Sequence, residues 1–218
     1  MSEETKSTGV ADPDMKLEVL VIPVSDVDRA KKFYARLGWR LDADRAAGDN
    51  FRLVQFTPPG SGSSIQFGMN LTSAAPGSAQ ATLLAVSDIE AVRSKLIALG
   101  VDASPVFHCE TGTACRFSNV GARVTAPHPE RLSYYSFVSF SDPDGNGWLL
   151  QEVTTRLAER IDPATTTFAS VSDLASALRR AANAHGEHEK RLGQPDANWL
   201  DWYAAYVVAE QTGEKFPQ

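Results

Sequence analysis

The stretch VSDVDRAKKFYARLG, residues 24–38, decides the fold, because it returns 62 positions later as VSDIEAVRSKLIALG, residues 86–100. Each copy follows an apolar segment typical of a strand. Each then offers a serine, with an acidic residue three positions on, as a helix cap, and ends at a glycine suited to stop a helix. The register survives without a gap. The chain therefore contains a duplicated βα unit, and we expect its site between the two halves.

Further strand patterns complete a β-α-β-β-β order in each copy. In the first copy the strands are predicted at 17–24, 39–44, 50–57 and 63–70, with a helix capped by Ser25. In the second copy they are predicted from 81, at 101–106, at 134–141 and at 148–154, with a helix capped by Ser87 and an irregular segment over 107–131. We predict an α+β fold in which two tandem βαβββ modules form a cupped mixed sheet around a cleft.

The predicted domain organisation has four parts. These are a disordered polar tail (1–15), the tandem domain (16–156, with modules at about 16–75 and 76–156), a linker (157–168) and a helical hairpin (169–218). Ser170 and Asn198 are expected to cap the two helices of the hairpin. Two apolar stripes are expected to face each other in it: Leu174, Leu178, Ala181, His185, His188 and Leu192 on the first helix, and Trp199, Trp202, Tyr203, Tyr206 and Val207 on the second.

The composition limits the classes of binding partner that we expect. A formal net charge of −6 argues against nucleic acid, which basic surfaces bind. No apolar run approaches the length of a membrane span, and the polar first residues do not form a secretory signal. With only Cys109 and Cys115, we expect a cytoplasmic protein with free thiols, and a local disulfide is the alternative.

Three motifs together resemble one family: the V-S-D junctions, Phe33-Tyr34 in the first helix, and the turn D-P-D-G-N at 142–146. They resemble the vicinal oxygen chelate superfamily, which includes glyoxalase I, bleomycin and fosfomycin resistance proteins and extradiol dioxygenases. The resemblance covers residues 16–154 and is strongest to bacterial glyoxalase-like proteins. It implies the cupped βαβββ fold and a homodimer, but no single activity, because this fold hosts unrelated chemistries.

The resemblance to metal-using members of that superfamily implies four His, Gln or Glu ligands that hold a divalent cation. The matching positions here are Val19, Gln66, Ala81 and Leu149. Only Gln66 carries a donor atom, and one neutral amide oxygen does not hold a divalent cation. We therefore predict no cofactor, with a divalent metal as the disfavoured alternative.

The irregular segment supplies the candidate catalytic residues. His108 has the pKa range of a general base, Arg116 or Arg123 can hold a carboxylate or enolate, and Tyr134 can donate a hydrogen bond. The alternative is a set of solvated loop charges with a structural histidine. An iron site of His108, His128 and Glu152 is disfavoured because Glu152 faces away from Leu149. For His185 and His188 we favour packing over metal binding.

The predicted ligand-binding residues are Gln66, Phe67, Leu149, Gln151 and Arg123. The function predicted first is a metal-independent protein that binds a small organic molecule in an apolar cleft. The alternative is a lyase, isomerase or oxygenase that uses His108, Arg116 and Tyr134. A third hypothesis is a scaffold that binds another protein through the aromatic hairpin.

Overall fold

The computed structural model describes residues 15–116, 121–157, 167–168 and 171–217. The predicted tail, apart from residue 15, and most of the predicted linker lie outside the described residues.

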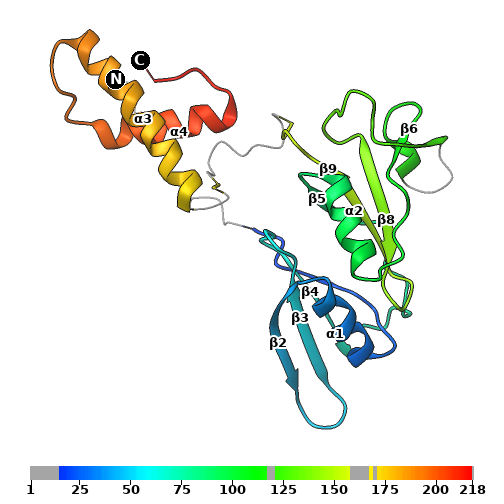
Figure 1. Ribbon diagram of the computed structural model, residues 1–218. Coiled ribbons are helices and arrows are strands. Elements are labelled where there is room, and N and C mark those ends of the chain that lie inside the picture. Colours follow the sequence, from blue (N-terminus) through cyan, green and yellow to red (C-terminus); the bar gives the residue numbers. More distant parts are fainter. Residues whose placement is uncertain (1–14, 117–120, 158–166, 169–170, 218) are drawn as a thin grey trace, which may run out of the picture. The chain divides into compact units, whose positions relative to one another are not determined.

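The first copy forms a four-stranded sheet with one helix against it (Figure 1). Its strands lie in the order β1-β4-β3-β2, with β1 parallel to β4 and the other pairs antiparallel. The bounds are β1 Val19–Val21, α1 Val27–Arg36, β2 Arg40–Ala46, β3 Arg52–Thr57 and β4 Ser64–Met69. The predicted β-α-β-β-β order of this copy is confirmed.

The second copy forms a five-stranded sheet in the order β5-β9-β8-β6-β7. Its bounds are β5 Thr82–Val86, α2 Ile89–Ala98, β6 Phe107–Cys109, the 3-10 turn η1 Ala114–Arg116, β7 Arg123–Thr125, β8 Ser136–Ser141 and β9 Gly147–Glu152. The strand predicted at 101–106 is wrong, because in that range only Ala103 forms a bridge, to Phe140. Instead, β6 and β7 form within the segment that was predicted to be irregular.

Both helix caps differ from the prediction by one residue. Asp26 accepts the backbone N–H groups of Asp28 and Arg29, and Asp88 accepts those of Glu90 and Ala91. A carboxylate at the cap also interacts favourably with the positive end of the helix dipole. Ser25 instead donates to Asp144, in the turn between β8 and β9.

The family motifs prove to be structural contacts around that turn. The hydroxyl of Tyr34 donates to Asp142 at 3.0 Å and accepts from the indole N–H of Trp148 at 3.3 Å. The side-chain amide of Asn146 donates to the carbonyl of Pro23 at 2.8 Å. Burial, and then the charge of Asp142, raises the pKa of Tyr34 well above its usual range. Tyr34 is therefore a buried neutral donor in the core rather than a reactive group.

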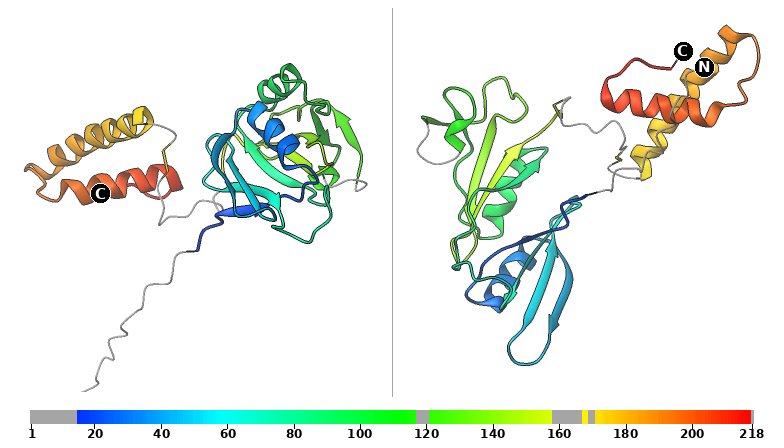
Figure 2. Two further views of the ribbon diagram at one scale, coloured as in Figure 1. Left: turned by 90° about the horizontal axis from the view of Figure 1, so that it is seen from below. Right: turned by 180° about the vertical axis from the view of Figure 1, so that it is seen from behind.

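The C-terminal residues form the predicted antiparallel hairpin of α3, Val171–Leu192, and α4, Trp199–Thr212 (Figure 2). Ala177, Ala181 and Val207 form its core. The predicted stripe is partly wrong, because Leu174, Leu178 and Leu192 are exposed and alanines take the contact positions. Asn198 occupies the cap position of α4, but its side chain makes no cap hydrogen bond. In the described part of the chain, no helix combines the length and apolar character that a membrane span requires.

The hairpin histidines are packed, as predicted. The ring of His188 stacks on Trp202 at 5.5 Å, and His185 meets the same indole edge-on at 5.0 Å. Nε2 of His185 lies 3.3 Å from the Asp196 carboxylate, and this hydrogen bond lowers the pKa of Asp196 after the larger effect of the Asn198 backbone N–H. These contacts account for both imidazoles without a metal.

Candidate functional site

The two faces of the first sheet differ in what they carry. Val54, Phe56, Ile65 and Phe67 are buried on the side of α1, where the ring of Tyr34 contacts Phe56 and Phe67. Side chains alternate along a strand, so the residues between them point away from α1. We call this second side the open face. It carries Val19 and Val21 on β1, Leu53, Gln55 and Thr57 on β3, and Ser64 and Gln66 on β4.

A polar network crosses the open face and converges on Asp42. The amide N–H of Gln66 donates to Oε1 of Gln55 at 2.8 Å, and the side chain of Gln55 is the last of the groups that lower the pKa of the Asp42 carboxyl. Thr57 donates its hydroxyl to the same carboxylate and lies 2.7 Å from the hydroxyl of Ser64. These contacts leave Gln55 and Gln66 half-buried in the middle of the sheet.

Asp42 is held in its ionised form. The hydrogen bond from Thr57, then that from Arg40 and other donors, keeps the pKa of this carboxyl below its usual range. Arg40 lies on the same strand and contacts Asp42 at 2.6 Å. At neutral pH the network therefore ends in a carboxylate that accepts hydrogen bonds and donates none.

The corresponding face of the second sheet is closed. The carboxylate of Glu152 accepts the N–H of Ile89 at the start of α2, so Gln151 points to the other side of β9. Along β8 and β6, the paired residues Phe107 and Phe137 share the side of Gln151. Phe107, Phe137 and Gln151 are all buried.

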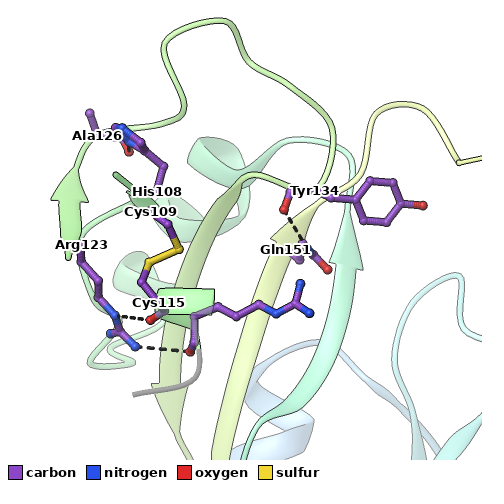
Figure 3. Close-up of a disulfide and its surroundings, with 8 residues drawn as sticks. His108, Cys109, Cys115, Arg123, Ala126, Tyr134 and Gln151 are labelled. Carbon is purple, nitrogen blue, oxygen red and sulfur yellow. Dashed lines mark hydrogen bonds between the residues drawn. A yellow bond between two sulfur atoms is a disulfide. The ribbon is translucent and has the colours of Figure 1, made fainter. Parts of the chain in front are cut away.

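A disulfide ties a turn to this closed face (Figure 3). Cys109 of β6 is bonded to Cys115 of η1, and both are buried. The guanidinium of Arg123 donates to the carbonyls of Cys115 and Arg116 and lies over the ring of Phe107 at 4.3 Å. The expected free thiols are wrong, and the alternative of a local disulfide is confirmed. The cysteine count therefore no longer supports the predicted cytoplasmic location.

The predicted catalytic residues His108, Arg116 and Tyr134 do not converge. His108 pairs with Ser136, on the face of the sheet opposite to Phe107, and its Nδ1 lies 2.9 Å from the carbonyl of Ala126. The ring of Tyr134 points away from His108 and from the disulfide (Figure 3). Arg116 belongs to η1, and its carbonyl accepts from Arg123.

The backbone of Tyr134 is strained and anchored. Its φ is +75°, and its N–H donates to the carbonyl of Glu152 at 2.7 Å, while its carbonyl accepts from Gln151 at 2.8 Å. Arg131, with φ +51°, binds both Glu90 and Glu152 at 2.6 Å. Glu152 is thus an ion-pair partner that holds this segment, and sequence reasoning missed the role of Arg131.

The other predicted ligand-binding residues fall into different environments. Gln66 lies on the open face, whereas Phe67 points to α1 and stacks on Phe56. Leu149 and Gln151 are buried on β9. Of the predicted set, Gln66 alone belongs to the polar network. Gln55 belongs there too, and the alternation of Leu53, Gln55 and Thr57 along β3 is the signal that would have found it.

At the positions where the resemblance places metal ligands, Val19, Ala81 and Leu149 carry no donor atom, and Gln66 offers a single neutral amide oxygen. Among the residues that the structure describes, there is no group of three or more His, Cys, Asp or Glu side chains arranged to hold a metal ion.

A cavity of about 530 Å³ lies beside the start of α1, on the side of the sheet opposite to the open face. Its charged groups bind each other or the backbone. Asp26 caps the helix, and Arg52 donates to Asp28 at 2.8 Å and to both oxygens of Asp44 at 2.9 Å. These groups stabilise the first module, so we place no ligand there.

Comparison with known proteins places the chain in a family. A family model described as "Glyoxalase/Bleomycin resistance protein/Dioxygenase superfamily" matches residues 16–150. No curated protein matches the chain.

Solved structures similar to this chain include two from bacteria. TnmS3, an antibiotic binding protein from Streptomyces sp. CB03234, is 26% identical over 64% of this chain and 97% of its own, with a TM-score of 0.48. A superfamily member from Sphaerobacter thermophilus DSM 20745 is 25% identical over 64% and 98%, with a TM-score of 0.47. Since the family model matches well over half of its residues, this chain belongs to the glyoxalase/bleomycin resistance protein/dioxygenase superfamily.

Proposed function

We propose that this chain binds a small organic molecule on the open face of its first sheet, without a metal ion. The observation that carries the proposal is the half-buried amide pair Gln55–Gln66, set among the apolar side chains of Val21 and Leu53. Ligand sites typically combine apolar surface with a few fixed polar groups. The open face offers both, on the strands of a rigid sheet.

The enzymatic alternative has less support. General acid–base catalysis needs the acting groups within hydrogen-bond reach of one substrate atom. His108 lies beside His128, whose own ring contacts Tyr135, and beside the carbonyl of Ala126, on the face of its sheet opposite to Phe107. We therefore rank binding above catalysis, the order that the sequence also favours, and propose the first sheet as the part of the predicted cleft that binds the ligand.

The test is a binding experiment with fragment-sized aromatic alcohols, amines, ethers and acids, followed by protein-observed NMR on isotope-labelled, chelator-treated protein. We expect a subset to bind and to shift the side-chain amide signals of Gln55 and Gln66. The double variant Q55L/Q66L should lose this binding and stay folded. The matched control is His108→Ala, which lies outside the open face and should bind like the wild type.

Two outcomes would reject the proposal. One is binding that appears only when a divalent metal is added back. The other is fragment binding that Q55L/Q66L retains and His108→Ala loses, which would restore the irregular segment as the site.

The family resemblance also predicts a homodimer, and we retain it as part of the proposal. Sedimentation at micromolar concentration tests it directly, because a monomer there would remove this element without affecting the binding site.

A further inference from the structure

The direction of the hydrogen bonds on the open face is fixed by Asp42. Gln55 presents its Oε1 to the N–H of Gln66, which leaves its N–H₂ group for Asp42, whose ionised carboxylate only accepts and whose pKa the Gln55 side chain lowers. Gln66 then donates to Gln55, and its own Oε1 is the end of the chain. The orientation of both amides follows from this one charged residue.

A second branch of the network consists of the hydroxyls of Thr57 and Ser64, and Asp42 fixes the direction of its hydrogen bonds in the same way. Thr57 has a single hydroxyl proton and gives it to Asp42. The hydrogen bond between Thr57 and Ser64 must therefore be donated by Ser64, whose oxygen keeps its lone pairs. Asp42 thus orients two separate branches, and each branch ends in an acceptor.

The two acceptors, Oε1 of Gln66 and Oγ of Ser64, belong to the same strand and the same face. They are two positions apart on β4, which is about 7 Å along a strand. Among the described residues, no donor to the Gln66 oxygen is recorded, and Ser64 Oγ contacts only Thr57. Each amide keeps one further N–H, so a group that both donates and accepts also fits.

From this polarity we propose that the open face prefers ligands that carry a hydrogen-bond donor on an apolar body. Alcohols, phenols and amines are such ligands, and they should bind more tightly than ethers, ketones and carboxylates. The inference rests on the function proposed above and names the ligand class of the same site. An ether or ketone can accept only from the further amide N–H groups and leaves the oxygens of Gln66 and Ser64 without a donor. A donor hydrogen completes one of the two branches, because the acceptors lie about 7 Å apart, and a chain of hydrogen bonds strengthens its terminal acceptor.

The probes are two matched pairs: 2-naphthol with 2-methoxynaphthalene, and 2-naphthylmethylamine with 2-naphthoate. Both members of the first pair are neutral, so the ratio of their dissociation constants isolates the polar group, and we expect 2-naphthol to bind at least about five-fold more tightly, the effect of one hydrogen bond. In the second pair the amine is a cation and the acid an anion at neutral pH, so their ratio also contains charge. That ratio is therefore compared between Asp42→Asn and Asp44→Asn, which each remove one carboxylate. Titration is followed by the side-chain amide signals of Gln55 and Gln66.

Asp42→Asn provides the decisive variant. The new amide can donate as well as accept, so the branches lose their fixed direction and the donor preference should fall to about two-fold or less. The matched control is Asp44→Asn, the same change on the same strand. Asp44 contacts Lys31 and Arg52 instead, and the control should keep the wild-type ratio. If Asp42→Asn does not fold, Gln66→Met removes one of the two terminal acceptors and should reduce the preference for 2-naphthol over 2-methoxynaphthalene.

The outcomes separate the two proposals. Binding of neither member of either pair overturns the proposed function and this inference with it. Equal binding of both members, or tighter binding of the ether and the acid, at the Gln55–Gln66 signals overturns only the inference. A donor preference that survives both Asp42→Asn and Gln66→Met also overturns it.

Discussion

The two copies of the βαβββ unit differ in the burial of the sheet face that points away from the helix. In the first copy, the face turned away from α1 carries the half-buried amides Gln55 and Gln66. In the second copy, the equivalent side holds Phe107, Phe137 and Gln151, all buried, with a disulfide-bonded turn tied to β6. The duplicated pattern fixes the backbone of both copies. The residues between the pattern positions decide which face is available to a ligand.

The strongest test of this difference in burial is the same leucine-to-alanine truncation on each of the two sheet faces. Leu149→Ala removes a side chain that is 3% exposed, and it should destabilise the protein by about 3 kcal/mol through lost burial and a residual cavity. Leu53→Ala removes a half-buried side chain from the open face and should cost about 1 kcal/mol. Urea unfolding of both variants measures the difference. Equal losses would show that the open face is as closed as the other one.

The disulfide gives the next largest effect. Replacing both Cys109 and Cys115 with serine should lower the free energy of unfolding by about 2 kcal/mol, the loop-closure value for a short loop. Amide exchange should rise at Phe107 and stay unchanged at Gln55. Intact mass before and after a dithiol reductant checks the bond itself, because reduction adds two hydrogens. A protein whose mass does not change under reduction would contradict the closed face as described.

Much of this fold could be predicted from its pattern, and the errors have local physical causes. The helices α1 and α2 follow from spacing and glycine stops, but their caps are Asp26 and Asp88 because a carboxylate one position later reaches two backbone N–H groups. The strand predicted at 101–106 failed because apolar composition does not supply a pairing partner. Apart from the single bridge between Ala103 and Phe140, the pairing of this segment with β8 begins at Phe107.

The helix caps test whether the two copies of the repeat are stabilised in the same way, with an expected loss of stability of intermediate size. Asp26→Ala and Asp88→Ala remove the same interaction from the two helices, and each should cost about 1 kcal/mol. Ser25→Ala and Ser87→Ala at the predicted cap positions serve as controls for the assignment. Thermal unfolding compares the four. A larger loss in Ser87→Ala than in Asp88→Ala would return the second cap to the serine.

The candidate site was harder to predict than the fold. Gln66 was found because a resemblance pointed to its position, whereas Asp42 could not be found by alternation. A register shift between Leu41 and Ala43 interrupts the pairing of β2 with β3 at that residue. The irregular segment misled for a different reason. Its His and Arg side chains suggest chemistry, but His108 and Arg123 bind backbone carbonyls of the same segment, which is a structural role.

The smallest expected change in stability comes from a test that compares the two carboxylates of β2, Asp42 and Asp44. Asp42 belongs to the open face, whereas Asp44 binds Arg52 and Lys31, and these contacts keep the pKa of Asp44 well below its usual range. A carboxyl whose pKa is lower in the folded state stabilises the protein fully above its unfolded pKa, and this stabilisation disappears as the pH falls through the folded value. Asp44→Asn should therefore cost less than about 1 kcal/mol at neutral pH, since partly exposed ion pairs are screened.

The same variant should also flatten the acid side of the stability profile. The gap between wild type and Asp44→Asn should begin to narrow below about pH 4, where the unfolded carboxyl becomes protonated while the folded one stays ionised. The gap should close as the pH falls toward the lower pKa of the folded carboxyl. Melting temperatures measured between neutral and acidic pH test the convergence. A constant gap at every pH would mean that Asp44 acts through packing rather than charge. Asp42→Asn in the same series shows whether the network on the open face shares this acid sensitivity, since the lowered pKa of Asp42 predicts the same sign.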